Sequence, residues 1–153
     1  MASPNTTFTS GAVLTAAQAN NFPFGLVAFA ENTSLAQTGI TTVQDITGLT
    51  VTFTGVAGRR YRVDGFLLLQ STVNADTVNL LIRNGAGTSL QQAIYPLPLN
   101  SNAYMCIASL YLSATGSTTI KLSTQRQGGT GTITANGGAS FPAQLIVTDI
   151  GSV

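Results

Sequence analysis

The sequence predicts an all-β fold, a single β-sandwich preceded by an N-terminal arm, and three observations support this prediction. Apolar and polar residues alternate with period two along most of the chain, which is typical of half-buried strands. Thr, Ser, Asn, Gln and Gly take the place of charged residues, and these residue types favour strands and turns. Only 7% of the 153 residues are charged, which excludes coiled coils and charged helical bundles.

Residues 1–24 differ from the rest of the chain and are predicted to form an assembly arm. The stretch 13–21 is rich in good helix formers, and Thr15 with Gln18 three residues later fits a capping box. One or two helical turns are therefore expected there, ended by Pro23. Apolar side chains placed before the first strand are predicted to bind a partner surface, and the arm residues singled out with the capping pair are Phe8, Val13, Leu14, Thr15, Gln18, Phe22 and Phe24.

The sandwich is predicted over residues 25–153, with nine or ten strands. Turn clusters separate the strands, as at Asn84-Gly85-Ala86-Gly87 and at 114–117. Many short strands joined by frequent turns favour a sandwich of the jelly-roll type. The strands are expected in chain order at 26–31, 49–54, 61–69, 78–82, 89–94, 104–112, 118–125, 130–135 and 143–150.

The strand at 61–69 carries a candidate subunit interface. Its odd-numbered residues share one apolar face, while the other face begins with charged residues and continues with Phe66 and Leu68. Apolar residues on both faces of one strand indicate burial on both sides or a contact with another subunit. We therefore predict that Arg60, Arg62, Phe66 and Leu68 lie at a subunit interface.

Three arginines, half of the basic residues, fall within four positions. Arg60 and Arg62 share one face of the strand, whereas Arg59 is placed in the preceding turn. We expect an ion pair across subunits or within one, with Asp64 or Asp76 as the partner. The alternative is a solvated strand end, where an exposed pair contributes only ~0–1 kcal/mol.

The sequence offers little material for catalysis. It contains no histidine, which excludes Ser-His-Asp and Cys-His pairs and histidine zinc sites. Cys106 lies in an apolar strand and is predicted to be a buried hydrophobic residue that forms no disulfide. The Gly-rich stretch 128–131 lacks the Gly-Lys-Ser/Thr ending of a phosphate loop. A glycosidase-like carboxylate pair is an alternative, but strand-end roles are favoured for the scattered acids Glu31, Asp45, Asp64, Asp76 and Asp149. No catalytic residue, metal or cofactor is expected.

The charge balance limits the partners of the chain. Six basic and five acidic residues give a net charge of +1, too little for electrostatic binding of nucleic acid. No apolar run approaches the ~18 residues that a membrane span requires. The N-terminus lacks the basic and apolar regions of a signal peptide. Because a net charge near zero promotes association, the expected partners are other protein subunits, copies of this chain included.

Three segments resemble small structural proteins of tailed bacteriophages, particularly those that infect actinobacteria: Gly11–Asn21 with Pro23-Phe24-Gly25, the block 48–63, and Leu145–Gly151. The resemblance implies a virion protein assembled in the host cytoplasm. It implies either a capsid decoration protein, bound by its arm to the major capsid protein or neighbouring virion subunits, or a tail or baseplate module that recognises a host glycan. An enzyme such as a capsule depolymerase is a third alternative. The strand order is also similar to C1q- and TNF-like jelly rolls, which implies a homotrimer.

Overall fold

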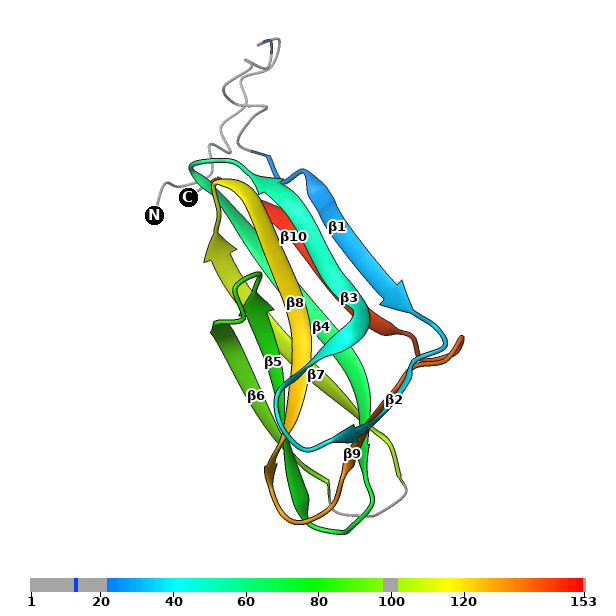
Figure 1. The fold of residues 1–153 in the computed structure, drawn as a ribbon. Helices are drawn as coiled ribbons and strands as arrows, with labels where there is room; N and C mark the ends of the chain where they lie inside the picture. The colour runs from blue at the N-terminus through cyan, green and yellow to red at the C-terminus, as the bar shows by residue number, and fades with distance from the viewer. Residues whose placement is uncertain (1–12, 14–21, 98–101, 153) are drawn as a thin grey trace.

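The computed structural model describes residue 13, residues 22–97 and residues 102–152, and the chain is all-β there (Figure 1). No helix occurs among these residues, and none therefore is long and apolar enough to cross a membrane. The helical turn predicted at Thr15–Gln18 lies outside them. The ten strands are β1 (Gly25–Asn32), β2 (Ala36–Ile40), β3 (Gln44–Gly55), β4 (Arg59–Ser71), β5 (Asp76–Asn84), β6 (Ser89–Leu97), β7 (Tyr104–Ser113), β8 (Gly116–Gly128), β9 (Ile133–Asn136) and β10 (Ala143–Ser152).

The strands form two antiparallel sheets, which confirms the predicted β-sandwich. Sheet A places β1, β10, β4 and β7 side by side, and sheet B places β3, β8, β5 and β6 side by side. The short strand β9 pairs with the end of β4 and with β2, which extends sheet A at one end of the molecule. Apart from the β5–β6 hairpin, successive long strands alternate between the sheets, and this order is that of a jelly roll.

The core fills the space between the sheets, and β4 contributes most directly to it. Its odd-numbered residues point inward as predicted, and Tyr61, Val63, Leu67 and Leu69 are at most 1% exposed. Burying such a side chain stabilises the fold by about 1.5–3 kcal/mol. The Phe53 ring of β3 packs against Tyr61 with ring centroids 4.9 Å apart, so an aromatic pair joins the two sheets.

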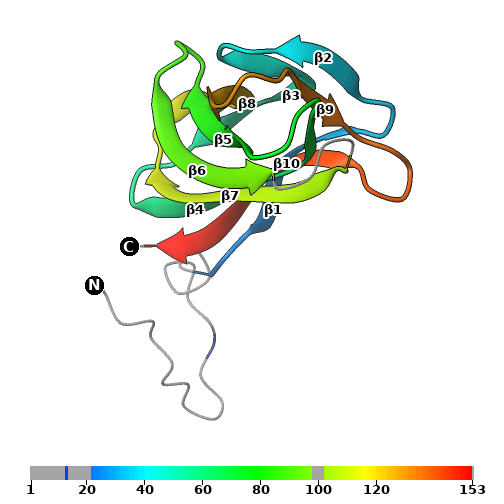
Figure 2. The same cartoon turned by 90° about the horizontal axis from the view of Figure 1, so that it is seen from below.

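Side chains close the two sides of the sandwich where sheet edges meet. At the β6–β7 side, the Tyr95 hydroxyl donates to the carbonyl of Ile107 at 2.5 Å and accepts from its N–H at 3.1 Å. At the β1–β3 side, the Asn32 amide donates to the carbonyl of Thr47 at 3.0 Å. Viewed along the strands, β6 lies beside β7 (Figure 2). These contacts satisfy backbone groups that an open edge would leave available to other strands.

Two strand predictions need correction. The sequence does not predict β2, because the segment 36–40 contains a single large apolar residue and shows no alternation. The strand expected at 130–135 begins instead at Ile133, because the N–H groups of Thr130 and Gly131 donate to the Asp76 carboxylate rather than to a neighbouring strand. The predicted turn at Asn84-Gly85-Ala86-Gly87 is confirmed by a 2.9 Å bond from the Gly87 N–H to the Asn84 carbonyl.

A substitution at Gly65 tests the packing between the two sheets. It lies on the inner face of β4, and a side chain there would overlap the Leu122 side chain of sheet B. We expect Gly65→Val to lower the free energy of unfolding by about 1–3 kcal/mol through overpacking. Thr54→Val, on the exposed side of β3, is the control and should change it by less than about 0.5 kcal/mol. Urea unfolding of both variants measures the difference, and equal effects would contradict the proposed packing.

Candidate functional site

Arg59 is buried and is the first residue of β4, whereas the sequence predicted a place in the preceding turn. Its Nε and Nη2 donate to the two carboxylate oxygens of Asp149 on β10. The two side chains are only 5% and 2% exposed. The pairing of β4 with β10 brings together these residues, which lie 90 positions apart in the sequence. A buried carboxylate needs such a partner, which explains why Arg59 is turned inward.

The same guanidinium holds the base of the arm. Its Nη2 donates to the backbone carbonyl of Phe22 at 2.7 Å, and its carbon atom lies 3.9 Å from the centroid of the Phe24 ring. A cation over an aromatic face attracts the ring, and guanidinium does so frequently. Two of the predicted arm residues are therefore attached to one buried cation, although Phe24 itself remains 63% exposed. We call Arg59, Asp149, Phe22 and Phe24 the arm anchor.

Of the other predicted arm residues, the structure describes Val13 alone. Val13 is 88% exposed. Phe8, Leu14, Thr15 and Gln18 lie outside the described residues. Their predicted role in binding a partner remains a prediction.

Within the arm anchor, Arg59 and Asp149 shift each other's pKa. Burial opposes ionisation of Asp149, but hydrogen bonds from Arg59 and from the Gly151 N–H, together with the charge of Arg59, lower the pKa of Asp149 below its ordinary value. The hydrogen bond to Asp149 raises the pKa of Arg59 against the opposing effect of burial. Both groups are therefore charged at neutral pH, and each compensates the charge of the other.

The remaining predicted interface residues lie on the outer side of β4. Arg60 and Arg62 are exposed and share one face, as predicted. Arg62 forms an ion pair with Asp64 of the same chain at 2.9 Å, and the Ser109 hydroxyl donates to that carboxylate at 2.6 Å. Phe66 and Leu68 are half-buried on the same side of the strand. The ion pair is thus formed within one chain.

Asp76 organises the Gly-rich loop at 128–131 instead of pairing with an arginine of β4. Its carboxylate accepts hydrogen bonds from the Ser71 hydroxyl at 2.5 Å and from the backbone of Thr130 and Gly131 at 3.1 and 3.0 Å. Gly129 has a φ of 96°, and a Cβ atom there would overlap the same carboxylate. The glycines therefore serve the close approach of the loop to Asp76, which is a structural role.

The remaining acids bind neighbouring side chains, and Cys106 is buried in the core. Glu31 accepts a hydrogen bond from Gln144, and Asp45 pairs with Arg83 and Lys121 at 3.0 Å. Partial burial opposes the ionisation of Asp45, but bonds from Ser123 and Lys121 lower its pKa overall. Cys106 is buried as predicted, and burial raises its thiol pKa to about 12, so the thiol stays protonated. The described residues contain no cluster of His, Cys, Asp and Glu that could hold a metal ion.

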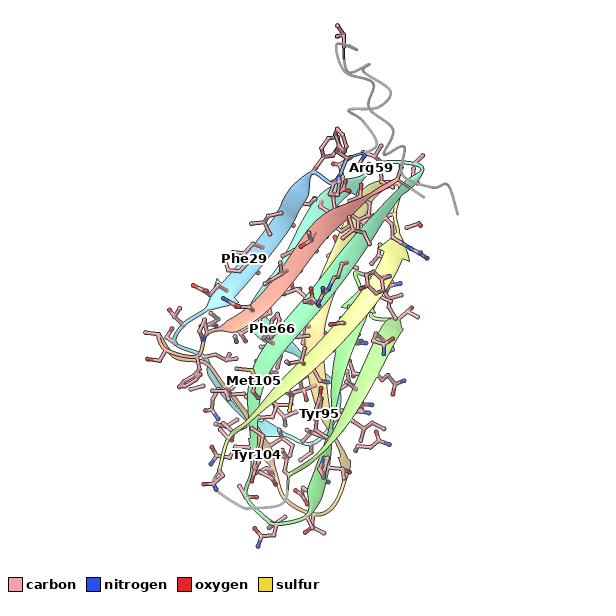
Figure 3. All side chains as sticks on the ribbon, turned by 180° about the vertical axis from the view of Figure 1, so that it is seen from behind. Phe29, Arg59, Phe66, Tyr95, Tyr104 and Met105 are labelled. Carbon is pink, nitrogen blue, oxygen red and sulfur yellow. The ribbon has the colours of Figure 1, made fainter. Side chains whose placement is uncertain are left out.

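The outer side of sheet A carries exposed and half-buried apolar side chains, among them Phe29, Phe66 and Met105 (Figure 3), and also the exposed Arg60 and Arg62. Phe66 lies opposite Ile107, and Leu68 lies opposite Met105, across the β4–β7 pair. Phe29 and Ile146 face each other across the β1–β10 pair. Phe29, Met105 and Ile107 are 42–47% exposed in the single chain. We call this surface the apolar face, and its residues are Phe29, Phe66, Leu68, Met105, Ile107 and Ile146.

The outer side of sheet B is polar in part. Thr50, Thr52 and Thr54 line its β3 side and are exposed. Thr52 and Thr119 join their hydroxyls at 2.8 Å across the β3–β8 pair. The outer side of sheet B is therefore polar on β3 and β8, whereas Leu90 and Ile94 of β6 are exposed there.

A hollow of about 230 Å³ opens where the turn after β1 meets β3. Polar and apolar atoms line it in nearly equal measure, and Leu35 is the one large apolar residue in its lining. The Gln37 amide carbonyl accepts hydrogen bonds from the Thr47 N–H and hydroxyl at 3.0 and 3.2 Å. The residues that line it are Asn32, Ser34, Leu35, Ala36, Gln37 and Thr47. None of these side chains is charged or aromatic.

The sequence predicted Phe22 and Phe24 as arm residues and Phe66 and Leu68 as interface residues. It did not predict Asp149 as the partner of Arg59. A signal was present, because Asp149 interrupts an apolar strand that ends in Ile150. Phe29 and Ile146 were also missed as members of the apolar face. Their strands alternate normally, and a single strand does not show which outward residues become neighbours.

Neither family models nor curated proteins match this chain.

Solved structures do give similar chains. One is from the infectious bursal disease virus particle, with 14% identity, a TM-score of 0.46, and coverage of 84% of this chain and 36% of that one. A mutant VP2 protein of the same virus has the same identity and TM-score, with 84% and 37% covered. The enzymatically active domain of tailspike protein 4 from bacteriophage CBA120 has 12% identity and a TM-score of 0.33, with 80% and 19% covered.

The structural neighbours thus include viral particle proteins and a phage tailspike domain. This chain spans less than two fifths of the length of each of them. All three TM-scores are below 0.5, so these similarities assign neither a family nor a function to the chain.

The arm anchor predicts an acid-dependent loss of stability. The lowered pKa of Asp149 means that unfolding takes up a proton in acid, so the stabilisation is complete above about pH 5 and is lost as the pH falls through the lowered pKa. We expect Asp149→Asn to cost about 3–5 kcal/mol at pH 7, because Arg59 is then buried without a counter-ion. The difference from the unchanged protein should shrink towards pH 2–3.

Urea unfolding at pH 7 and pH 3 measures this effect. Arg62→Gln is the control, because it breaks an ion pair whose arginine is 48% exposed and should cost less than about 1 kcal/mol at either pH. A difference between Asp149→Asn and the unchanged protein that is the same at both pH values would contradict the role assigned to the pair.

Proposed function

We propose that this chain is a bacteriophage virion structural protein: a homotrimeric capsid decoration protein that binds the outer shell through its N-terminal arm. The resemblance of three sequence segments to phage structural proteins supports the class. The low charge, the net charge of +1 and the exposed apolar residues Phe29, Met105 and Ile107 on sheet A support contact with other subunits.

The observation that carries the proposal is the arm anchor. Arg59 binds the backbone of Phe22 and the ring of Phe24, and Asp149 holds Arg59 in place. The places of Phe22 and Phe24 beside the sandwich are therefore fixed by a buried ion pair. Three such arms in a trimer would bind a shell with avidity, because linked weak contacts add without a strong single site.

The proposed protein is not an enzyme. Each of its five carboxylates is bound to a structural partner, and the Cys106 thiol remains protonated. A hydrolase would need a free carboxylate pair, and a thiol nucleophile would need a cationic neighbour to lower its pKa. The chain contains no histidine to activate either group.

The alternative is a tail or baseplate module that recognises a host glycan. The observation in its favour is the polar hollow at Asn32, Gln37 and Thr47, whose amide and hydroxyl groups could bind sugar hydroxyls. We favour decoration because the hollow has no aromatic side chain in its lining and several of its polar groups already bond to one another.

The arm is tested on phage particles that lack this protein. We expect Phe8→Asp with Leu14→Asp to weaken binding of the full-length chain at least tenfold, because the apolar contacts of the arm are lost. Thr6→Asp with Ser10→Asp is a charge-matched control in the same arm and should bind as the unchanged protein does. Sedimentation of the particles with bound protein measures the fraction bound.

Two outcomes would contradict the proposal. Full binding by the Phe8 and Leu14 variant would show that the arm is not the anchor on the shell. Labelling of the unchanged protein on the tail rather than the head, seen by electron microscopy of whole virions, would favour the alternative module.

A shortened chain tests the arm anchor separately. A chain that starts at Phe22 keeps the Phe22 carbonyl and the Phe24 ring beside Arg59, whereas a chain that starts at Gly25 loses both. We expect both to fold and neither to bind particles, and we expect the shorter one to be less stable by about 1–3 kcal/mol. Thermal unfolding compares them, and equal stability would contradict the arm anchor.

A further inference from the structure

Exposed apolar side chains gather at the end of the sandwich that carries the arm anchor. The start of β1, the turn between β3 and β4 and the end of β10 lie together at this end (Figure 1). Five large apolar side chains here are 37–64% exposed, and they are Phe22, Phe24, Leu26, Val56 and Ile150. We call these five residues the end patch.

Three members of the end patch lie against Arg59. The Phe22 carbonyl accepts a hydrogen bond from the Arg59 guanidinium, and the Phe24 ring lies 3.9 Å from its carbon atom. On the other side, the Arg59 N–H donates to the Val56 carbonyl at 3.2 Å. One buried residue therefore fixes the places of all three.

The other two members flank Asp149. Ile150 follows Asp149 in β10. Leu26 follows Gly25, which is paired with Asp149 between β1 and β10. Because Arg59 binds Asp149, all five members surround a single buried ion pair. The end patch is thus one surface, built from three separate segments of the chain.

The opposite end of the sandwich has a different surface. Its described loops are 72–75, between β4 and β5, and 129–132, between β8 and β9. Neither loop contains an exposed large apolar side chain. Clustered exposed apolar residues mark sites of protein contact, and among the described loops they occur at the end to which the arm is joined.

We propose that the end patch is a second contact with the outer shell of the particle, and that it packs against an apolar protein surface there. The inference rests on the proposed function, because that function brings the arm to the shell. The arm supplies one contact and the sandwich itself supplies the other. Two linked contacts raise the avidity of each subunit and fix its orientation on the shell.

The length of the arm brings the end patch to the shell. Residues 1–21 join the sandwich at Phe22, which is itself a member of the end patch. Leu14, an arm residue predicted to bind the partner, precedes Phe22 by eight positions, and a chain of that length spans at most about 29 Å. The far end of β4, a strand of 13 residues, is about 43 Å away at about 3.3 Å per residue. A bound arm therefore holds the end patch, and not the opposite end, close to the shell.

The charges at this end define the chemistry of the partner surface. Arg59 and Asp149 are buried and neutralise each other. Arg60, the next residue of β4, is exposed. A symmetric contact between the end patches of two copies would bring two Arg60 side chains together, and like charges oppose such a contact. An apolar shell surface with an acidic residue at its rim fits the end patch without that repulsion.

The test is sedimentation of the full-length chain with phage particles that lack this protein. Leu26→Asp and Val56→Asp place a charge in the end patch and leave the two phenylalanines of the arm anchor unchanged. Ile94→Asp is the matched control, because Ile94 is 59% exposed on β6 and Leu26 is 64% exposed. We expect both end-patch variants to bind at least tenfold more weakly, since burial of an unpaired charge opposes the contact, and the control to bind as the unchanged protein does.

Thiol labelling tests whether the shell covers the end patch directly. Cys106 is buried, so a cysteine introduced at the surface is the reactive one. We expect Val56→Cys to be labelled at least tenfold more slowly on particles than in solution, and Ile94→Cys to be labelled at the same rate in both. Circular dichroism and urea unfolding establish that each variant is folded, and two end-patch positions are used so that one remains informative if the other variant unfolds.

The outcomes that overturn the inference differ from those that overturn the proposed function. Full binding by Leu26→Asp and Val56→Asp, beside lost binding by the Phe8 and Leu14 variant, would show that the arm alone contacts the shell. Equal weakening by Ile94→Asp would show that the effect is not specific to the end patch.

Light scattering separates the remaining possibilities. A lower mass of both end-patch variants than of the unchanged chain would show that the end patch joins copies of this chain, which would refute the inference and leave the homotrimer intact. An unchanged chain that does not bind particles at all would refute the proposed function and, with it, this inference.

Discussion

The pairing of β4 is the interaction on which the rest of the structure depends. This strand bonds to β10 and β9 along one side and to β7 along the other, so it fixes the register of sheet A. Its inner residues form the middle of the core, while its first residue, Arg59, holds the arm and its outer residues Phe66 and Leu68 form the middle of the apolar face. One strand therefore determines stability, the place of the arm and the character of one surface.

The two faces of such a strand are under different constraints. The inner face must be apolar because it lies between two sheets, and every sandwich strand satisfies that requirement in a similar way. The outer face is free to be polar, as the threonines of β3 are on sheet B. The apolar residues on the outer side of sheet A are thus a departure that the core does not require.

The arm anchor and the apolar face differ in physical character. A buried ion pair contributes little net stability against an apolar alternative, but it fixes geometry, because a misplaced partner would leave a charge uncompensated. The Arg59–Asp149 pair suits a position at which the direction of a chain matters. The apolar face suits association between copies, because apolar burial is strong and does not depend on direction.

The sequence by itself determined most of the strands, because the alternation of apolar and polar residues is a local property. Period two placed Tyr61, Val63, Leu67 and Leu69 inside and Phe66 and Leu68 outside, and the turn residues marked most strand ends. Only the tertiary structure decided that Arg59 meets Asp149, that Asp76 holds the loop at 128–131, and that Phe29 and Ile146 join Phe66 on one surface. These contacts depend on which strands become neighbours and in which register, and strands far apart in the sequence carry no local signal of either.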